Sequence, residues 1–451
     1  MLRFLSLSLR WGQNNNQPKT RPSKALSRCK SFYDDRRGTV AVMMGISLPI
    51  FIGFLGMAVD VPNWYLSQRK AQTAVDAGAI SGAYSLYYSE DSYESESAAA
   101  EGAKRNEFVA DSGRTLTVNI PPLSGPYAGD NTAVEVIGTE LQTVFLASLI
   151  MDDEVYIQVR AVARAAQDRG EVCVLALDPE GQGAITFSGT SDTGIGCDVH
   201  SNSKDPQSVW LKGGAEGVLG NISAVGEIDI GTNTDFDMSE VSPLSWMIPI
   251  KNPYGVYGAN LQVPSSPVSC DFTRLVVKDE VTLMPGRYCD GISASTGSEI
   301  TFAPGIYIID GGTFEASSSA YMFGEDVTFV LTGSGKDYAM VQFNGGAEID
   351  LSASKSGEFE GILFFQDPNA GKGTKVYQNK FNGGSSLRLV GTLYFPNQEL
   401  VYNGGATISN SCLQIVALRV TFNGNATVGK NNCPNDMQLA GIKLTRIKLV
   451  E

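Results

Sequence analysis

The chain has 451 residues, of which 43% are hydrophobic and only 18% are charged, and it contains 49 glycines. This length exceeds one ordinary hydrophobic core, so we expect two or more folded units. Low charge and abundant glycine are typical of a β-rich protein rather than a helical one. The net charge of -14 argues against nucleic acid as a partner, because phosphate binding needs a basic surface.

The charge is unevenly distributed along the chain. Residues 1–37 carry nine Lys or Arg against two Asp, a net of +7, so the remaining residues carry -21. We expect residues 1–37 to be a basic, disordered, cytoplasmic segment. Arg36 and Arg37 end it, an uncharged run of 21 residues from Thr39 to Val59 follows, and Asp60 closes that run. A basic leader before an apolar run and an acidic region after it is the positive-inside pattern.

The uncharged run predicts a membrane anchor over residues 38–59, flanked by Arg36, Arg37 and Asp60. As a helix, its length is sufficient to span a hydrocarbon core, and secretory signal cores are shorter. The orientation follows from the charge: N-terminus in the cytoplasm, body outside. Two processing alternatives stay open, namely cleavage as a signal peptide after Ala58 or as a pilin leader after Gly38. A buried core helix is a third alternative, which the flanking charge asymmetry opposes.

The anchor and the residues after it resemble the N-terminal region of the TadE/TadG-like family, bacterial proteins of tight-adherence (Flp) pilus assembly. The shared features are Arg-Gly before the anchor, a proline within it and aspartate after it. An aromatic-Leu pair, a Gln-x-x-x-Asp-Ala step and an Ala/Gly-rich helix follow, in "NWYLSQRKAQTAVDAGAISGA". Met43 stands where a pilin would have glutamate, so the resemblance is to the TadG-like type. It implies an inner-membrane scaffolding role among pilus-assembly or envelope proteins.

Residues 60–168 are predicted to form a helical stalk and a small α+β unit. The helix is expected to continue, with breaks, to about Ala110. Small residues at Ala74, Gly78 and Gly82 line one helix face, which permits close approach of another helix or simply reflects a good helix former. The stretches "RTLTVNIPP", "NTAVEVIGTE" and "VYIQVRAVARA" predict strands, the last by its clear alternation.

Residues 170–435 carry an internal repeat of about 20 residues. Pro-Gly-x-Tyr occurs at 285–288 and 304–307, and an aromatic-Asn-Gly triplet begins at Phe343, Phe381, Tyr402 and Phe422. The triplet steps are 38, 21 and 20 residues, and 38 is twice 19. Short β-branched strands at this period, separated by Gly/Asn turns, predict a large right-handed parallel β-helix. A β-sandwich is the alternative. Residues 436–451 are expected to be a C-terminal tail.

Six of the seven cysteines fall in this β-rich region and form three sequence pairs. Cys29 lies in the segment expected to be cytoplasmic. The partners within each pair are 24, 19 and 21 residues apart, close to one repeat, so neighbouring pairs would staple successive turns of the chain: Cys173 with Cys197, Cys270 with Cys289, and Cys412 with Cys433. Disulfides need an oxidising compartment such as the periplasm. Six cysteines allow 15 connectivities, and buried free thiols remain an alternative.

Enzyme motifs are incomplete, so we expect no catalytic activity, no cofactor and no metal. Asn233 to Asp237 and Arg446 to Lys448 resemble the first and last motifs of polygalacturonases, but the Gly-His-Gly and the Asp pair between them are missing. The only histidine, His200, precedes the acids. Asp350 to Ser354 matches the metal motif of von Willebrand-type domains, but the β-rich stretch after it does not suit that domain. Calcium held by Asp/Asn turns and carbohydrate binding stay open.

The predicted protein is therefore mostly β, single-pass, and anchored in the bacterial inner membrane with its body in the periplasm. We expect a non-catalytic scaffolding component of Flp/Tad-type pilus assembly. A surface adhesin or envelope-binding module is the alternative, and a polysaccharide-active β-helix enzyme is a weaker one. The specific partner and the oligomeric state do not follow from the sequence.

Overall fold

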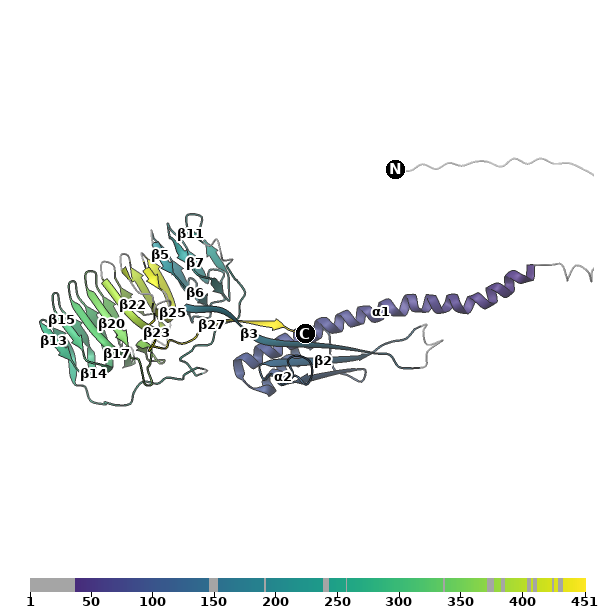
Figure 1. Ribbon diagram of the computed structural model, residues 1–451, viewed down its shortest axis with the longest axis horizontal. Helices are drawn as coiled ribbons and strands as arrows, with labels where there is room; N and C mark the ends of the chain where they lie inside the picture. The colour runs from purple at the N-terminus through teal and green to yellow at the C-terminus, as the bar shows by residue number, and fades with distance from the viewer. Residues whose placement is uncertain are drawn as a thin grey trace, which may run out of the picture. The chain divides into compact units, whose positions relative to one another are not determined.

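A computed structural model describes residues 37–145, 153–189, 192–237, 243–256, 258–335, 337–370, 377–382, 386–403, 407–408, 412–423, 426–428 and 433–451. The chain divides into two compact units, residues 1–71 with 139–158 and residues 72–138 with 159–451. The secondary structure is mostly β, with one long apolar helix and one short helix (Figure 1).

Helix α1 (Arg37–Ser89) runs for 53 residues and continues through Pro49 and Pro62. Glu90 has a φ of 57° and ends it. Asp91 then caps α2 (Ser92–Arg105), and its carboxylate accepts from the backbone N–H groups of the residues two and three positions later. An aspartate at this position satisfies N–H groups that have no partner within the helix. The expectation of a broken helix reaching about residue 110 was therefore wrong in extent, because one sharp break at residue 90 separates two regular helices and the second ends at Arg105.

A small sheet follows the helices and contains strands β1 (Arg114–Asn119), β2 (Ala133–Leu141) and the first part of β3 (Tyr156–Ala176). All three were predicted from the sequence, the third by its alternating pattern. The fourth strand was not predicted: β27 (Lys443–Leu449) pairs antiparallel with β3, between Ala163 and Glu171. The segment expected as a C-terminal tail thus contains a strand of this sheet.

The second part of β3 opens a stack of parallel strands, in which three consecutive strands form one layer. Each strand pairs in parallel with a strand of the next layer, so that β3 pairs with β6, β4 with β7 and β5 with β8. The first run of layers contains β4 (Ile185–Phe187), β5 (Asp192–Ile195), β6 (Asp198–Ser201), β7 (Val209–Leu211), β8 (Glu216–Leu219), β9 (Ile222–Ala224), β10 (Ile228–Ile230) and β11 (Asp235–Asp237).

In a second run of layers, strands again pair in parallel with strands of the next layer. The number of residues along the chain between paired partners is small where Glu280 pairs with Glu299 and twice as large where Glu348 pairs with Ser386. Phe343 pairs directly with Phe381, so the longest step of the triplet repeat is one enlarged layer and not two ordinary ones. The strands are β12 (Phe272–Val277), β13 (Glu280–Leu283), β14 (Gly286–Ala294), β15 (Glu299–Phe302), β16 (Gly305–Ala316), β17 (Tyr321–Ser334), β18 (Asp337–Tyr338), β19 (Met340–Phe343), β20 (Glu348–Ala353), β21 (Ile362–Gln366), β22 (Gln378–Phe381), β23 (Ser386–Asn403), β24 (Thr407–Ile408), β25 (Leu413–Asn423) and β26 (Ala426–Val428).

The two runs join into one stack, but not in the order of the sequence. The last layer of the second run pairs in parallel with the first layer of the first run: β25 with β3 and β4, and β26 with β5. The stack therefore begins at β12, runs to β26, continues with β3 and ends at β11. We call the contact of β25 and β26 with β3, β4 and β5 the layer junction. Apart from the short antiparallel pair of β17 with β18, the strands of this stack pair in parallel, which opposes the β-sandwich alternative, whose sheets are antiparallel.

Between the runs, residues 243–271 cross along the stack from its last layer back to its first. Asn202 in the first run exchanges two hydrogen bonds with the backbone of Ile250, at 2.8 and 2.9 Å. Further along, the Tyr254 hydroxyl lies 3.1 Å from Thr392 Oγ1, and Arg287 donates to the carbonyl of Pro267 at 3.0 Å. Ile250, Tyr254 and Leu261 of this crossing segment are buried in a second hydrophobic cluster, separate from the interior core of the stack.

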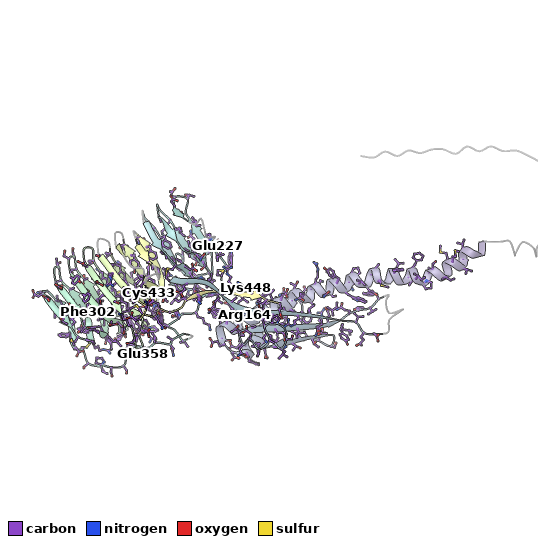
Figure 2. The ribbon with its side chains drawn as sticks, viewed as in Figure 1. Arg164, Glu227, Phe302, Glu358, Cys433 and Lys448 are labelled. Atoms are coloured by element: carbon purple, nitrogen blue, oxygen red, sulfur yellow. A yellow bond between two sulfur atoms is a disulfide. The ribbon has the colours of Figure 1, made fainter. Side chains whose placement is uncertain are left out.

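The interior of the stack is filled by aromatic and aliphatic side chains from every layer. Phe302, labelled in Figure 2, packs edge-on against Phe329 and Tyr307, with ring centroids 4.9 and 5.1 Å apart. All three rings are buried, and each fully buried ring of this size contributes roughly 1.5–3 kcal/mol through loss of exposed apolar area. The stack therefore has a continuous hydrophobic core of its own.

Candidate functional site

The first part of α1 carries the features of a membrane span. The helix is long and apolar enough to cross a membrane, judged by length and composition alone, and side chains such as Met43 are 67% exposed. Of the predicted flanking residues, Arg36 lies outside the described residues and Arg37 begins α1. Exposure of so many apolar side chains on one helix calls for a partner other than water.

Asp60, predicted as the residue that flanks the end of the anchor, is completely buried. The backbone N–H of Phe145 donates to its Oδ1 at 3.2 Å, and one helical turn later Trp64 Nε1 donates to the carbonyl of Thr143 at 3.2 Å. Both contacts come from residues 139–145, which with residues 153–158 form what we call the β2–β3 arm. The sequence could not show this burial, because the arm is distant from Asp60 along the chain.

The small-residue face of α1 packs against α2 and β2. A Cβ added to Gly78 would lie 2.9 Å from the carbonyl oxygen of Ala99, and one added to Gly82 would lie 2.9 Å from a methyl group of Val134. Ser95 also donates to the carbonyl of Gly82 at 2.8 Å. The prediction of close helix approach is confirmed, and α2 of the same chain is the helix that approaches.

The structure brings the six outer cysteines to disulfide distance in the three pairs expected from their spacing. The Cα atoms are 5.9 Å apart in Cys173–Cys197, 5.7 Å in Cys270–Cys289 and 4.6 Å in Cys412–Cys433. These separations lie in the range that a disulfide spans without backbone movement. All three pairs lie where a run of layers begins or ends.

The aromatic-Asn-Gly triplets form two ladders that cross the layer junction. Their asparagines hydrogen-bond in series from Asn344 through Asn382 and Asn403 to Asn423, which accepts a bond from Ser188 in the first run. Inside the stack, the rings of Phe422 and Phe187 lie 5.1 Å apart and nearly parallel. Phe187 and Ser188 therefore continue the triplet series into the first run, and Ser188 lies 235 residues from Asn423 in the sequence.

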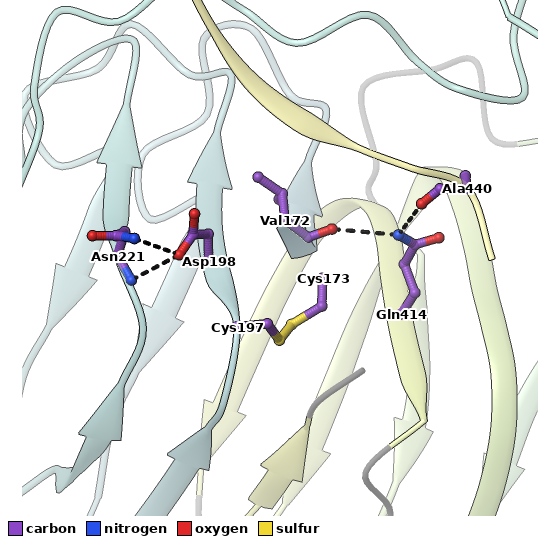
Figure 3. Close-up of a disulfide and its surroundings, with 7 residues drawn as sticks. All are labelled: Val172, Cys173, Cys197, Asp198, Asn221, Gln414 and Ala440. Carbon is purple, nitrogen blue, oxygen red and sulfur yellow. Dashed lines mark hydrogen bonds between the residues drawn. A yellow bond between two sulfur atoms is a disulfide. The ribbon is translucent and has the colours of Figure 1, made fainter. Parts of the chain in front are cut away.

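Gln414 hydrogen-bonds across the layer junction, close to the Cys173–Cys197 pair (Figure 3). No sequence pattern predicted this role. Its side chain is fully buried, and its Nε2 donates to the carbonyls of Val172 at 3.3 Å and Ala440 at 2.9 Å. Its Oε1 accepts from Thr392 Oγ1 at 3.2 Å. One amide therefore joins the first layer, the last two layers of the second run and the segment that leads to β27.

Replacing Gln414 with leucine is expected to lower the free energy of unfolding by about 2 kcal/mol. The substitution keeps the volume but removes the amide that donates to the carbonyls of Val172 and Ala440, and the loss of such a buried donor costs about 1–3 kcal/mol less any relaxation. Chemical denaturation of the full chain in detergent measures the loss. The matched control is Gln378→Leu, at an exposed position on β22, which we expect to change stability by less than about 0.5 kcal/mol. Equal effects of the two substitutions would contradict the role given to Gln414.

Replacing Tyr402 with phenylalanine is expected to stabilise the protein by about 1 kcal/mol. The Tyr402 hydroxyl is buried in the aromatic ladder and makes no hydrogen bond within the described residues, and burial raises its pKa. Removing an unpaired buried hydroxyl recovers its desolvation cost. Thermal and chemical denaturation report the change. Tyr307→Phe is the control with the opposite sign, because the Tyr307 hydroxyl lies within hydrogen-bond distance of two carbonyls, at 2.7 and 2.8 Å.

The residues that resemble an enzyme site are not brought together. Asp235 and Asp237 belong to β11 in the parallel stack, whereas Arg446 and Lys448 belong to β27 in the small sheet. His200 is fully buried in β6, where it pairs with Leu175 of β3. Asp350 lies in β20, where its carboxylate pairs with Arg388 at 2.5 Å. Among the described residues, no group of three or more His, Cys, Asp or Glu side chains is placed to hold a metal ion.

Comparison with known proteins gives one match. Residues 38–85 match the family model described as putative Flp pilus-assembly TadE/G-like. The matched range covers the apolar part of α1 and its small-residue face. Neither a curated protein nor a solved structure matches the chain.

Proposed function

Because residues 38–85 are a TadE/G-like Flp pilus-assembly segment, we propose that this chain is a membrane-anchored, non-catalytic scaffolding component of Flp/Tad-type pilus assembly. The single observation that carries the proposal is that the family match coincides with the one candidate membrane span among the described residues. Met43, in place of a pilin glutamate, supports the TadG-like type, here without a von Willebrand domain.

The proposed location is the bacterial inner membrane, with the N-terminus in the cytoplasm and the β-rich region in the periplasm. The net of +7 over residues 1–37 supports the cytoplasmic side for the N-terminus. The three cysteine pairs at disulfide distance support an oxidising compartment for the remainder. Charge and cysteine placement are independent of each other, and both favour the same orientation.

The parallel stack is proposed to be a right-handed parallel β-helix that serves as a rigid support for partner proteins. Parallel layers, interior aromatic stacks and the asparagine ladder support this architecture. A stack held by parallel pairing on every layer resists bending, and its length offers an extended surface to envelope partners. Its role would be to hold those partners at a fixed place in the cell envelope.

Site-specific photo-crosslinking in intact cells tests the function. With a photoreactive benzoylphenylalanine at Met43, on the exposed face of α1, we expect crosslinks to other pilus-assembly membrane proteins. The same probe at buried Phe329 is the matched control and should give none. Crosslinks at Met43 only to proteins unrelated to pili would refute the proposal.

Deletion of the gene separates the rival functions. We expect cells that lack the chain to lose assembled Flp pili, observed by electron microscopy. Normal pili with lost attachment to surfaces would instead favour an adhesin. Release of sugars from acidic polysaccharide by the purified chain would favour an enzyme.

A further inference from the structure

The outward surface of α1 stays uncharged well beyond the end of the predicted anchor. From Thr39 to Gln68 the only charged residue is Asp60, and its side chain is completely buried. The first exposed charge is that of Arg69. Thirty helical residues extend about 45 Å, which matches a bilayer including its headgroup layers rather than the hydrocarbon core alone.

The tip of the β2–β3 arm is held at the point where the hydrocarbon part of this helix would end. Phe145 N–H donates to Asp60, and Trp64 donates to Thr143 in the next helical turn. The arm itself continues the pairing of its strands, because Gln142 N–H donates to the carbonyl of Val155 at 2.8 Å. The Asp60 carboxylate therefore has a donor near the membrane, where an unsatisfied charge would be costly.

The side chains around this contact are those that favour a membrane–water interface. Phe145 is 57% exposed, Tyr156 55% and Tyr65 54%, and they come from the arm and from the helix beside it. Tyrosine, which has an apolar ring and a polar hydroxyl, is enriched at the headgroup level, and Phe145 adds an exposed apolar ring beside the two tyrosines. The Tyr156 hydroxyl donates to Glu154 at 2.6 Å, and Asp153 and Glu154 are exposed, which keeps the acidic edge of the arm in water.

We propose that the tip of the β2–β3 arm is a second membrane contact, with Phe145, Tyr156 and Tyr65 lying in the headgroup layer beside the span. The partner is the lipid surface, because the Phe145 N–H bond to Asp60 holds the exposed Phe145 ring beside the helix whose preceding residues form the apolar span. The proposal rests on α1 crossing a membrane, as the proposed function requires. Contact at two places fixes the rotation of α1 about its axis, which a single helix does not do.

Spin labelling of the full chain in phosphatidylcholine nanodiscs tests the second contact. Single cysteines at Phe145 and Tyr156 are introduced into a Cys29→Ser parent, which itself should take up no label. Met43→Cys reports the span, and Leu123→Cys, at a side chain 75% exposed, reports water. Collision rates with oxygen and with a water-soluble nickel complex give the depth of each label. Two arm positions guard against a local folding defect at one of them.

We expect the labels at Phe145 and Tyr156 to collide with nickel several-fold less often than the label at Leu123, and to lie shallower than the label at Met43. If Met43 lies in lipid while both arm labels are as accessible to nickel as Leu123, the second contact is refuted and the anchor stands. If Met43 is also fully accessible to nickel, the anchor and the second contact fail together.

Discussion

Breaking the three cysteine pairs is expected to lower the free energy of unfolding of the β-rich region by about 3 kcal/mol for each pair. The pairs close loops of 24, 19 and 21 residues, and a crosslink of that length removes conformational freedom from the unfolded chain. Single domains are stable by only about 5–15 kcal/mol, so loss of all three would leave the region close to unfolding.

The position of each pair adds a structural reason for a large effect. Cys173 lies at the entrance to the first run, Cys270 directly precedes β12 at the open end of the stack, and Cys412 joins the last layer of the second run to the segment that leaves it. A terminal layer has only one neighbour to pair with, so it opens more readily than an interior layer. A crosslink at each of these places prevents that opening.

Denaturation and hydrogen exchange of the full chain in detergent measure this effect. The double variant Cys270→Ser, Cys289→Ser should lose about 3 kcal/mol and should show faster exchange in β12 and β13 than in β20. Cys29→Ser is the matched control and should leave both measurements unchanged, since that cysteine has no predicted partner. Unaltered stability in the double variant, or free thiols in the native protein by mass spectrometry, would contradict the prediction.

Acidification is expected to destabilise the protein through its only histidine, by about 1.4 kcal/mol for each pH unit below about 6.5. His200 is fully buried in β6; burial lowers its pKa to about 3, although a side-chain hydrogen bond with Asn202 opposes the shift. Its Nδ1 lies 2.8 Å from Ser223 Oγ, and its Nε2 has no hydrogen-bond partner within the described structure.

The sign follows from the two states. Between about pH 6.5 and 3, unfolded His200 binds a proton that folded His200 rejects, so protons favour unfolding throughout that range. The stability that depends on neutral His200 is fully present above pH 6.5, and it is lost as the pH falls toward the pKa of His200 in the folded protein. Between pH 7 and pH 5 this amounts to about 2 kcal/mol, before most carboxylates begin to titrate.

Comparison with His200→Gln isolates this effect. Glutamine has similar size, can hydrogen-bond Ser223 and does not titrate, so the variant should lose the pH dependence between pH 7 and pH 5 even if its stability at pH 7 is lower. Urea denaturation at half-unit pH intervals provides the curves. Parallel curves for the two proteins would show that His200 is protonated as easily in the folded chain as in the unfolded one.

Local repetition made much of the β-rich region predictable. The aromatic-Asn-Gly triplets predict where each layer turns. They recur because the aromatic ring of one layer stacks on the ring at the equivalent position of the next layer. The spacing of Cys270 and Cys289 reports the same period independently. The order of the layers was not predictable, because Phe187 and Phe422 meet only after the crossing segment has carried the chain to the far end of the stack.

The features of α1 and its surroundings also include some that local sequence predicted and some that it did not. The apolar run and the glycines of α1 are local signals, and the packing of Gly78 and Gly82 against α2 followed from them. The burial of Asp60 was missed because a charge after an apolar run ordinarily marks the water boundary, and only a distant strand pair covers this one. Gln414 was missed because a single glutamine in a strand carries no pattern, although its buried amide joins four parts of the chain.

If the chain is exported in the proposed orientation, the layer junction sets the order in which its fold can be completed. The first layers, from β3 to β11, emerge well before β25, so one edge of β3, β4 and β5 has no strand to pair with during that interval. Unpaired strand edges attract other chains, and pairings between such distant residues form slowly. We therefore expect truncation before β25 to leave an aggregation-prone chain, and export of the whole protein to depend on a periplasmic chaperone that covers this edge until the last layer arrives.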